Sequence, residues 1–414
     1  MTLSPARRNT LFVLAITATL LNLVDRQIIS VLKPEISRDM GWSDNDYGSL
    51  AAWFQGSAAI AFLFTGLAVD RLGVKWANPI GVALWSLAAM AHAFARGFGS
   101  FVLCRVALGA TEAMGTPAAI KTIAVIFPPS MRSFGYGITN TVGSLGAIIT
   151  PLLIPTIALL WGWRAAFLIG GGLGLVWAIA WLIAARGVHF AGDRHDGQEA
   201  APAPTGSIFV ERRTWAIAIA KFLSDATWWL MLFWMPDFFH RSFGLEGIAL
   251  GTPLAIAYSC SAIGSLIAGT VASRLIRAGR SVEKVRKGSL LVAALLATPL
   301  PFADTVHSYA LAVALIGLVM AGHQAFSVNL FALIADVSRP EKIGRVTSFG
   351  AFSGNVGGMV IAKVAGLTLA AGFGYWPLFL FAGCSYLLAL GAIQVLLPRL
   401  PLDGMGTPPP AGAH

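Results

Sequence analysis

Charged residues are scarce in this sequence. Only 12% of its 414 residues are Asp, Glu, Lys or Arg, whereas 56% are hydrophobic, and the mean hydropathy is +0.73. Apolar runs of about twenty residues, the length that crosses a bilayer, recur along the whole chain. The sequence therefore predicts an all-α polytopic membrane protein.

Cysteine is also scarce, because the chain has only Cys104, Cys260 and Cys384. Each lies inside an apolar run, which argues against a disulfide framework and against a Cys-x-x-Cys metal site. We interpret the three as packing residues and expect neither a metal nor a cofactor.

Catalytic motifs are missing as well. The sequence has no His-Glu-x-x-His, no Gly-x-x-x-x-Gly-Lys-Ser/Thr and no Gly-x-Ser-x-Gly. The one glycine cluster, Gly170-Gly-Gly-Leu-Gly174, lies within an apolar run, where glycines let helices pack closely. We therefore expect neither an enzyme nor hydrolysis of ATP.

The net charge of +10 would suggest nucleic acid in a soluble protein. Here the basic residues instead concentrate in alternate loops between apolar runs, which is a topology signal. The other loops hold only Lys33, Arg38, Arg96, Arg164 and Arg241. This distribution predicts that both termini are cytoplasmic and that nucleic acid is not a partner.

We predict twelve spans, at residues 10–32, 46–69, 76–96, 98–127, 132–158, 163–185, 214–240, 247–277, 286–304, 307–337, 343–372 and 375–397. They form two six-helix bundles, residues 1–185 and 214–397. The polar stretch 186–213 is interpreted as a cytoplasmic linker between the bundles, and residues 398–414 as a disordered cytoplasmic tail.

An internal repeat supports two homologous halves. Gly66-Leu-Ala-Val-Asp70-Arg71 follows the second span, and Gly269-Thr-Val-Ala-Ser273-Arg274 follows the eighth, about half a chain later. A second echo pairs Asn140-Thr-Val-Gly143 with Asn355-Val-Gly357.

Two spans carry charges that are costly inside a bilayer and therefore mark a functional site. Arg105 and Glu112 in the fourth span are two helical turns apart, so they share one helix face about 10 Å apart along the axis. Asp25 and Arg26 lie in the first span, and Asp25 and Arg105 are at a similar depth. We expect these residues to face one central cavity.

These motifs resemble the major facilitator superfamily. Gly66-x3-Asp70-Arg71-x-Gly73-x-Lys75 resembles its loop signature, and Arg105-x3-Gly109 resembles its fourth-span pattern. Other motifs resemble the anion:cation symporters within it, above all hexuronate and D-galactonate transporters. They are Asp25-Arg26, Arg105-x6-Glu112, Phe127-Pro128 with Arg132, Trp228-Trp229 and Gly322-His323-Gln324-Ala325-x-Ser327. One departure is Ala58, beside Ser57 and Gln55, where several of these transporters carry tyrosine.

Asp25 and Glu112 are the predicted proton-coupling residues. Asp25 can pair with Arg105, either as a permanent structural salt bridge or in alternate states that leave Arg26 to bind a ligand carboxylate. Glu112 has no cation within a turn of its own helix, and burial favours a protonated acid, which a proton carrier requires. The alternative for Glu112 is a permanently protonated acid that hydrogen-bonds a neighbouring helix. Lys121, Lys221 and Lys363 are expected to reach the membrane surface from the span ends.

Ten residues form the predicted substrate site, because carboxylates, amides, hydroxyls and aromatic faces bind sugars. They are Arg26, Arg105, Asn140, Asp225, Trp228, Trp229, His323, Gln324, Ser327 and Asn355. The tryptophan pair can equally serve packing, and the polar residues of the tenth span can equally join helices.

The loop motif predicts a cytoplasmic gate formed by Gly66, Asp70, Arg71, Gly73 and Lys75. As a whole, the sequence predicts a monomeric, proton-coupled importer of a sugar-acid anion in a bacterial-type inner membrane. An organic-anion exchanger or effluxer of the same fold remains an alternative, as does a membrane sensor without turnover.

Overall fold

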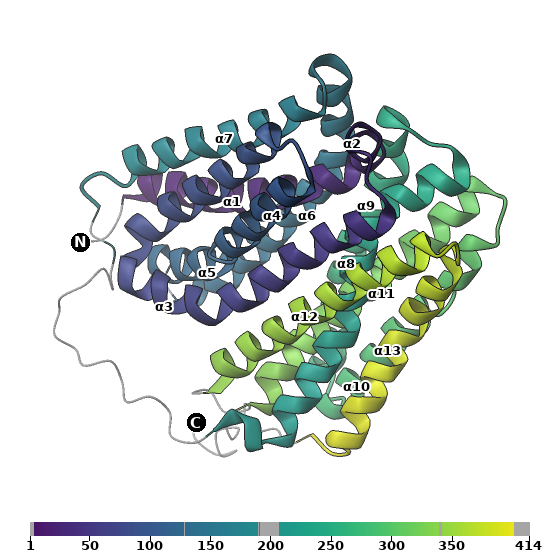
Figure 1. Ribbon diagram of the computed structural model, residues 1–414. Coiled ribbons are helices and arrows are strands. Elements are labelled where there is room, and N and C mark those ends of the chain that lie inside the picture. The colour runs from purple at the N-terminus through teal and green to yellow at the C-terminus, as the bar shows by residue number, and fades with distance from the viewer. Residues whose placement is uncertain (1–3, 128, 189, 191–206, 339–341, 401–414) are drawn as a thin grey trace, which may run out of the picture. The chain divides into compact units, whose positions relative to one another are not determined.

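The computed structural model is helical throughout the part of the chain that it describes, with no strand there (Figure 1). This part comprises residues 4–127, 129–188, 190, 207–338 and 342–400. Most of the predicted linker and the predicted tail from residue 401 onward therefore lie outside it.

The helices reproduce the twelve predicted spans. The long ones are α1 (Pro5–Val31), α3 (Asp44–Ala91), α6 (Pro129–Trp161), α7 (Trp163–Ala184), α8 (Arg212–Phe243), α9 (Gly251–Arg277), α10 (Val282–Ala297), α11 (Tyr309–Val337), α12 (Ile343–Ala370) and α13 (Trp376–Leu396). The fourth span consists of α4 (Phe98–Glu112) and α5 (Gly115–Ile126), and the short α2 (Lys33–Met40) follows α1. Large exposed apolar side chains such as Trp53, Leu103 and Leu159 suit contact with lipid.

The helix α3 holds two predicted spans. Its backbone leaves the helical conformation at Gly73, where φ is 70° and ψ is 166°. Glycine has no Cβ and reaches a positive φ without strain, so the chain can turn sharply there. The second and third spans thus meet at a glycine of the predicted gate.

The fourth span is broken directly after Glu112. Residues Ala113 and Met114 form a turn, and α5 begins at Gly115. Pro117 has no N–H to donate to the carbonyl of Ala113, and its ring would collide with that carbonyl in a continuous helix. The break therefore follows from the sequence, although we predicted one unbroken span.

By internal packing the chain divides into two compact units. Unit 1 comprises Met1–Gly197, Trp229–Ser259 and Gly358–Tyr375, and unit 2 comprises Gln198–Trp228, Cys260–Gly357 and Trp376–His414. The boundaries fall inside α8, α9 and α12, so unit 1 includes segments of the second predicted half. Within unit 1, α1 runs beside α7 (Figure 1) and also contacts α6, while α3 packs on α4 and α7.

Candidate functional site

The first charge cluster of unit 1 is formed by Asp25, Arg26, Arg105 and Glu112 and is called the Arg26 cluster. Its one ion pair joins α1 to α4, because Nη2 of Arg26 lies 2.8 Å from Oε2 of Glu112. Nε of Arg26 donates to the same oxygen at 2.9 Å, and Nη2 also donates to Asn22. The Glu112 side chain is fully buried, whereas that of Arg26 is 19% exposed. Glu112, which has no cation within a turn of its own helix, thus finds its partner in the first span.

Aromatic rings flank the Arg26 guanidinium. Its Cζ lies 5.4 Å from the ring centroid of Phe54 in α3 and 5.2 Å from that of Trp229 in α8. Both rings are buried, and cation–π attraction strengthens when water is excluded. The rings therefore help to hold the guanidinium in place, while the side chain as a whole stays partly exposed.

Arg105 is completely buried, and its three guanidinium nitrogens have no hydrogen-bond partner among the described residues. Its Cζ lies 4.3 Å from the Phe54 centroid, so Phe54 contacts both arginines. One turn later, a Cβ on Gly109 would collide with the backbone oxygen of Phe54 and with Ser57. Gly109 thus allows α4 to approach α3 closely enough for this stacking.

Asp25 lies against α7. Its Oδ1 lies against Gly170 of α7, where an added Cβ would be only 2.8 Å from it. Neither carboxylate oxygen has a hydrogen-bond partner within the described ranges. The predicted Asp25–Arg105 pair is therefore wrong for this structure. The prediction of packing glycines in α7 is confirmed for Gly170, Gly171 and Gly174, which lie against neighbouring helices, whereas a Cβ on Gly172 would meet no described atom within 4 Å.

A second charge cluster of unit 1 lies near the start of α3 and is called the Lys33 network. Nζ of Lys33 lies 2.8 Å from Oδ1 of Asp44 and 2.6 Å from Oδ1 of Asp237. Arg241 pairs with both acids, at 2.7 Å to Asp237, and the Tyr375 hydroxyl donates to Asp237. The network joins the chain near the first and second spans to the end of the seventh span and the start of the twelfth. We had interpreted Lys33 and Arg241 only as topology signals.

Unit 2 has its own polar cluster. Nζ of Lys221 lies 2.7 Å from Oδ2 of Asp225, one turn later in α8, and Ser224 donates to Oδ1 of Asp225 at 3.3 Å. Gly354 of α12 lies so close to the Asp225 carboxylate that a Cβ there would overlap with it. Lys221 therefore neutralises an acid within its span.

A histidine and two aromatic rings extend this cluster. Nδ1 of His323 is 2.8 Å from the Tyr386 hydroxyl, and the Trp228 ring stacks on His323 at 5.0 Å. Gln324 and Ser327 in α11 are half-buried. The amide of Asn355 donates to the carbonyl of Ala351 in its own helix at 2.8 Å.

The predicted gate residues lie around the Gly73 bend. The exposed Asp70 accepts a hydrogen bond from Nζ of Lys121 in α5 at 2.9 Å, so this pair stays within unit 1. The carbonyl of Lys75 accepts from Trp181, and Gly66 and Arg71 are exposed.

The lysines near span ends also have partners, since Lys363 donates to Asn45 and Ser49. The expectation that Lys221 reaches the membrane surface is wrong, because it is buried and pairs with Asp225 within its own span.

Some predicted residues cannot be compared with the structure. The backbone of Asn140 lies in α6, but its side chain and that of Arg132 fall outside the description, as does Pro128. Conversely, sequence reasoning missed Phe54 and noted Gln55 only as a neighbour of Ala58. Gln55 is fully buried, and its amide has no hydrogen-bond partner in the described part of the chain. A polar amide one residue after an aromatic in an apolar run was the available signal.

The profile of the Major Facilitator Superfamily matches residues 15–362. The hexuronate transporter of Escherichia coli (strain K12) is 26% identical over 401 residues, which cover 92% of this chain and 92% of that protein. The D-galactonate transporter of Escherichia coli O6:H1 is 24% identical over 417 residues, covering 95% and 96%. A crystal structure of a bacterial homologue of the human lysosomal transporter Spinster, inward-facing and occupied, has a TM-score of 0.74 at 16% identity. It covers 95% of this chain and 96% of its own and supports the fold alone.

Proposed function

Because this chain belongs to the Major Facilitator Superfamily, whose members are transporters and not enzymes, we propose that it imports a sugar-acid anion together with protons by alternating access. The observation that carries the proposal is the Arg26–Glu112 pair. The guanidinium of the partly exposed Arg26 side chain is held by a fully buried carboxylate and two aromatic rings. The names of the two relatives support the substrate class.

In this mechanism the carboxylate of the substrate competes with Glu112 for Arg26. A planar guanidinium binds a carboxylate through two parallel hydrogen bonds, which favours a ligand that can align with it. Glu112 then loses its cationic partner while it remains buried. An unpaired buried charge is costly, so Glu112 takes up a proton as the anion binds. Anion and proton are thereby coupled through one arginine.

Asp25 is the second proton-coupling candidate. It is 1% exposed and has no hydrogen-bond partner among the residues described, so its charged form is costly as well. One proton for each monovalent anion makes transport electroneutral, whereas two protons carry a net positive charge inward. The potential then contributes about 2.3 kcal/mol per 100 mV.

The remaining site residues are assigned to recognition of the sugar. Arg105 adds positive charge beside Arg26, and Trp229 offers an aromatic face. In unit 2, Asp225, Gln324 and Ser327 supply the donors and acceptors that hydroxyl groups need. The assignment also includes Asn140, Trp228, His323 and Asn355.

The loop residues Gly66, Asp70, Arg71, Gly73 and Lys75 are assigned to a cytoplasmic gate. The Asp70 side chain is 72% exposed, and an exposed ion pair is weak, so its contact with Lys121 breaks easily during a conformational change. The distribution of lysine and arginine supports cytoplasmic termini in a bacterial-type inner membrane. A monomer of two six-helix halves joined by residues 186–213 completes the proposal.

Glu112→Gln tests the coupling, because a neutral amide imitates the protonated acid. In proteoliposomes with labelled glucuronate, this variant should lose accumulation driven by a pH gradient but keep exchange of substrate for substrate. Glu246→Gln, which alters an exposed pair with Arg38, serves as the control and should keep both activities.

Accumulation by Glu112→Gln along a pH gradient would remove Glu112 from the coupling site. If the unchanged protein exchanges glucuronate but ignores the pH gradient, it is an exchanger or effluxer. Binding without turnover would identify a sensor. Uptake that is insensitive to an imposed potential would exclude the two-proton version.

A further inference from the structure

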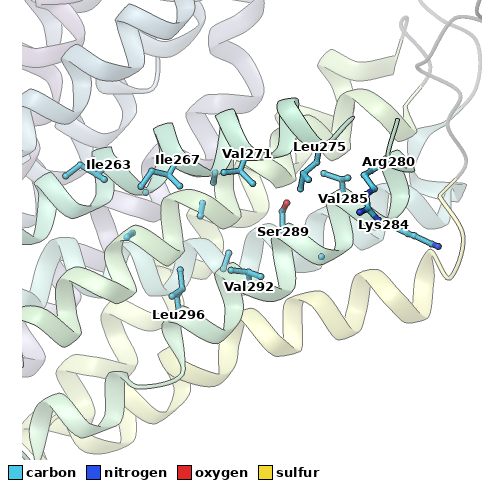
Figure 2. A pocket seen from close by; sticks show the side chains of 16 residues that line it. Ile263, Ile267, Val271, Leu275, Arg280, Lys284, Val285, Ser289, Val292 and Leu296 are labelled. Carbon is cyan, nitrogen blue, oxygen red and sulfur yellow. The ribbon is translucent and has the colours of Figure 1, made fainter. Parts of the chain in front are cut away.

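A groove on unit 2 lies between α9 and α10 (Figure 2), and its lining shares no residue with the charge clusters described above. Its volume is about 570 Å³, within the range of small-molecule sites. Apart from Arg280, Lys284 and Ser289, its lining residues are apolar or glycine. Several of them are large and exposed, including Ile263, Ile267 and Val292.

The two walls of the groove, α9 and α10, both pack closely against small residues of α11. Gly264 of α9 approaches the backbone of Ala321 so closely that an added Cβ would collide with it. Gly322 of α11 lies equally close to the carbonyl of Ala293 in α10. The two walls are thus held on neighbouring α11 residues, and the alanines of α11 leave the space between the walls unfilled.

The groove is apolar along its length and basic at one end. Figure 2 shows Ile263, Ile267 and Val271 along α9, whereas Arg280 and Lys284 lie together at the far end. From Ile263 to Leu275 the helix rises about 18 Å, close to half of a hydrocarbon core of about 30 Å. The groove is therefore as long as one membrane leaflet is thick.

Arg280 and Lys284 differ from the nearby Arg286 and Lys287 in having no acidic partner among the described residues. Arg286 pairs with Asp336 and Lys287 with Glu283. Arg280 and Lys284 are both exposed. By the distribution of basic residues, this end of the groove faces the cytoplasm.

We propose that this groove binds an anionic glycerophospholipid of the cytoplasmic leaflet, with one acyl chain against α9 and α10 and the phosphate at Arg280 and Lys284. An apolar channel of leaflet length fits an acyl chain, and unpaired cations at its cytoplasmic mouth fit an anionic headgroup. A soluble anion would use only the basic end, and a neutral lipid only the apolar part.

Native mass spectrometry of the full chain in detergent tests the proposal. The probes are phosphatidylglycerol and phosphatidylcholine with identical acyl chains. The unchanged protein should bind phosphatidylglycerol more tightly. Arg280→Gln/Lys284→Gln should weaken phosphatidylglycerol binding roughly twentyfold, about fivefold for each cation, and leave phosphatidylcholine unaffected.

Arg274→Gln/Arg277→Gln is the matched control, because it removes two nearby cations that do not line the groove. It should change phosphatidylglycerol binding less than threefold, as expected of roughly screened surface charges. An equal loss in both double variants would show diffuse attraction to the surface and overturn the proposal. Displacement of the lipid by an equal concentration of glycerol 3-phosphate would overturn it too, because the acyl chain would then contribute nothing.

A second variant fills the groove and keeps its charges. Gly288→Leu adds a side chain where no atom lies within 4 Å of the new Cβ, and it should weaken binding of both lipids. Gly391→Leu in α13, which is equally unobstructed, should not. Unchanged lipid binding by Gly288→Leu would refute the site. The site would also be refuted if the unchanged protein formed a dimer that Gly288→Leu dissociates, because the groove would then be the contact between two copies.

Discussion

The two charge clusters of unit 1 differ in how completely their charges are paired. In the Lys33 network, Lys33, Asp44, Asp237 and Arg241 each contact a partner of opposite charge, and Tyr375 adds a hydrogen bond. In the Arg26 cluster, only Arg26 and Glu112 pair, whereas the polar atoms of Asp25 and Arg105 lack hydrogen-bond partners among the described residues.

This difference separates two uses of buried charge. A fully paired network is stable only in the arrangement that brings its partners together, so it fixes chain segments relative to one another. A partly paired cluster keeps a binding capacity that a charged ligand or a proton can satisfy. We therefore expect substitutions in the Lys33 network to change stability first and substitutions in the Arg26 cluster to change binding first.

Asp237→Ala should have the largest effect on stability. It removes the acid that Lys33, Arg241 and Tyr375 share, and Lys33 stays 3% exposed with Asp44 as its remaining acidic partner. Breaking a buried pair in this way costs about 3–5 kcal/mol of unfolding free energy. Denaturant unfolding in detergent measures the loss.

The control for Asp237→Ala is Glu246→Ala. It breaks the Arg38–Glu246 pair, whose side chains are 68% and 58% exposed. The loss there should be below about 1 kcal/mol. Equal losses in the two variants would mean that burial does not increase the contribution of the Lys33 network to the unfolding free energy.

Arg26→Lys should change binding and leave stability nearly intact. The ammonium still compensates Glu112, but it cannot form two parallel hydrogen bonds with a carboxylate. We expect glucuronate affinity to fall roughly thirtyfold, equivalent to about 2 kcal/mol. Isothermal titration of the purified protein measures the change, with the exposed Arg38→Lys as the control. Affinity equal to that of the unchanged protein would refute the role of Arg26.

Gly109→Ala tests how the Arg26 cluster is positioned. The added methyl group collides with the backbone of Phe54 and must push α4 away from α3, at a cost of about 1–3 kcal/mol. Glucuronate affinity should fall as well, because Arg105 moves with α4. Gly66→Ala provides the comparison, since its Cβ would meet no atom within 4 Å. Identical melting curves for the two variants would show that the contact between α3 and α4 is not tight.

The smallest expected effect on stability is at Glu211, just before α8. This residue pairs with two cations, as the acids of the Lys33 network do, but it is only half-buried, so it shows what pairing contributes without full burial. The hydrogen bond from Lys342, at 2.5 Å, and the charge of Arg213 hold the pKa of its carboxyl below the ordinary 4.5. This stabilisation is complete above the ordinary pKa and is lost as the pH falls through the lowered one.

Glu211→Gln should therefore lower the unfolding free energy at pH 7 by less than about 1 kcal/mol. The difference from the unchanged protein should be smaller in acid at about pH 3, because it is lost as the pH falls through the lowered pKa. Unfolding curves at both pH values measure it. A difference that persists undiminished in acid would show that the carboxylate charge does not stabilise unit 2.

The sequence predicted the helices well and the charge pairs poorly, for one physical reason. Apolar length and loop charge determine where a chain crosses a bilayer, and both are local. Pairing depends on the direction in which a side chain leaves its helix. Asp25 and Arg26 are at nearly the same depth but point about 100° apart, so depth alone suggested that Asp25 meets Arg105. In the structure Asp25 faces Gly170, and Arg26 reaches Glu112.

Polar residues in loops were misjudged for a related reason. Lys33 and Arg241 have the sequence context of ordinary loop charges, and their shared partner Asp237 lies about two hundred positions from Lys33. Pro117 made a kink or a break after Glu112 foreseeable, although α6 continues through Pro151 and Pro155. The stacking of two arginines on Phe54 was not, because it requires the Gly109 contact between α3 and α4.

That contact also bears on how the protein is made. An arginine opposes insertion of an isolated helix, by about 2.5–3.5 kcal/mol at the centre of a span, and Arg105 lies in the first half of the fourth span. During synthesis α3 emerges before α4, so Phe54 is already in the membrane when Arg105 reaches it. Close packing against α3, which Gly109 permits, then offsets this cost. We therefore expect membrane insertion of α4 to depend on its contact with α3, which is synthesised before it.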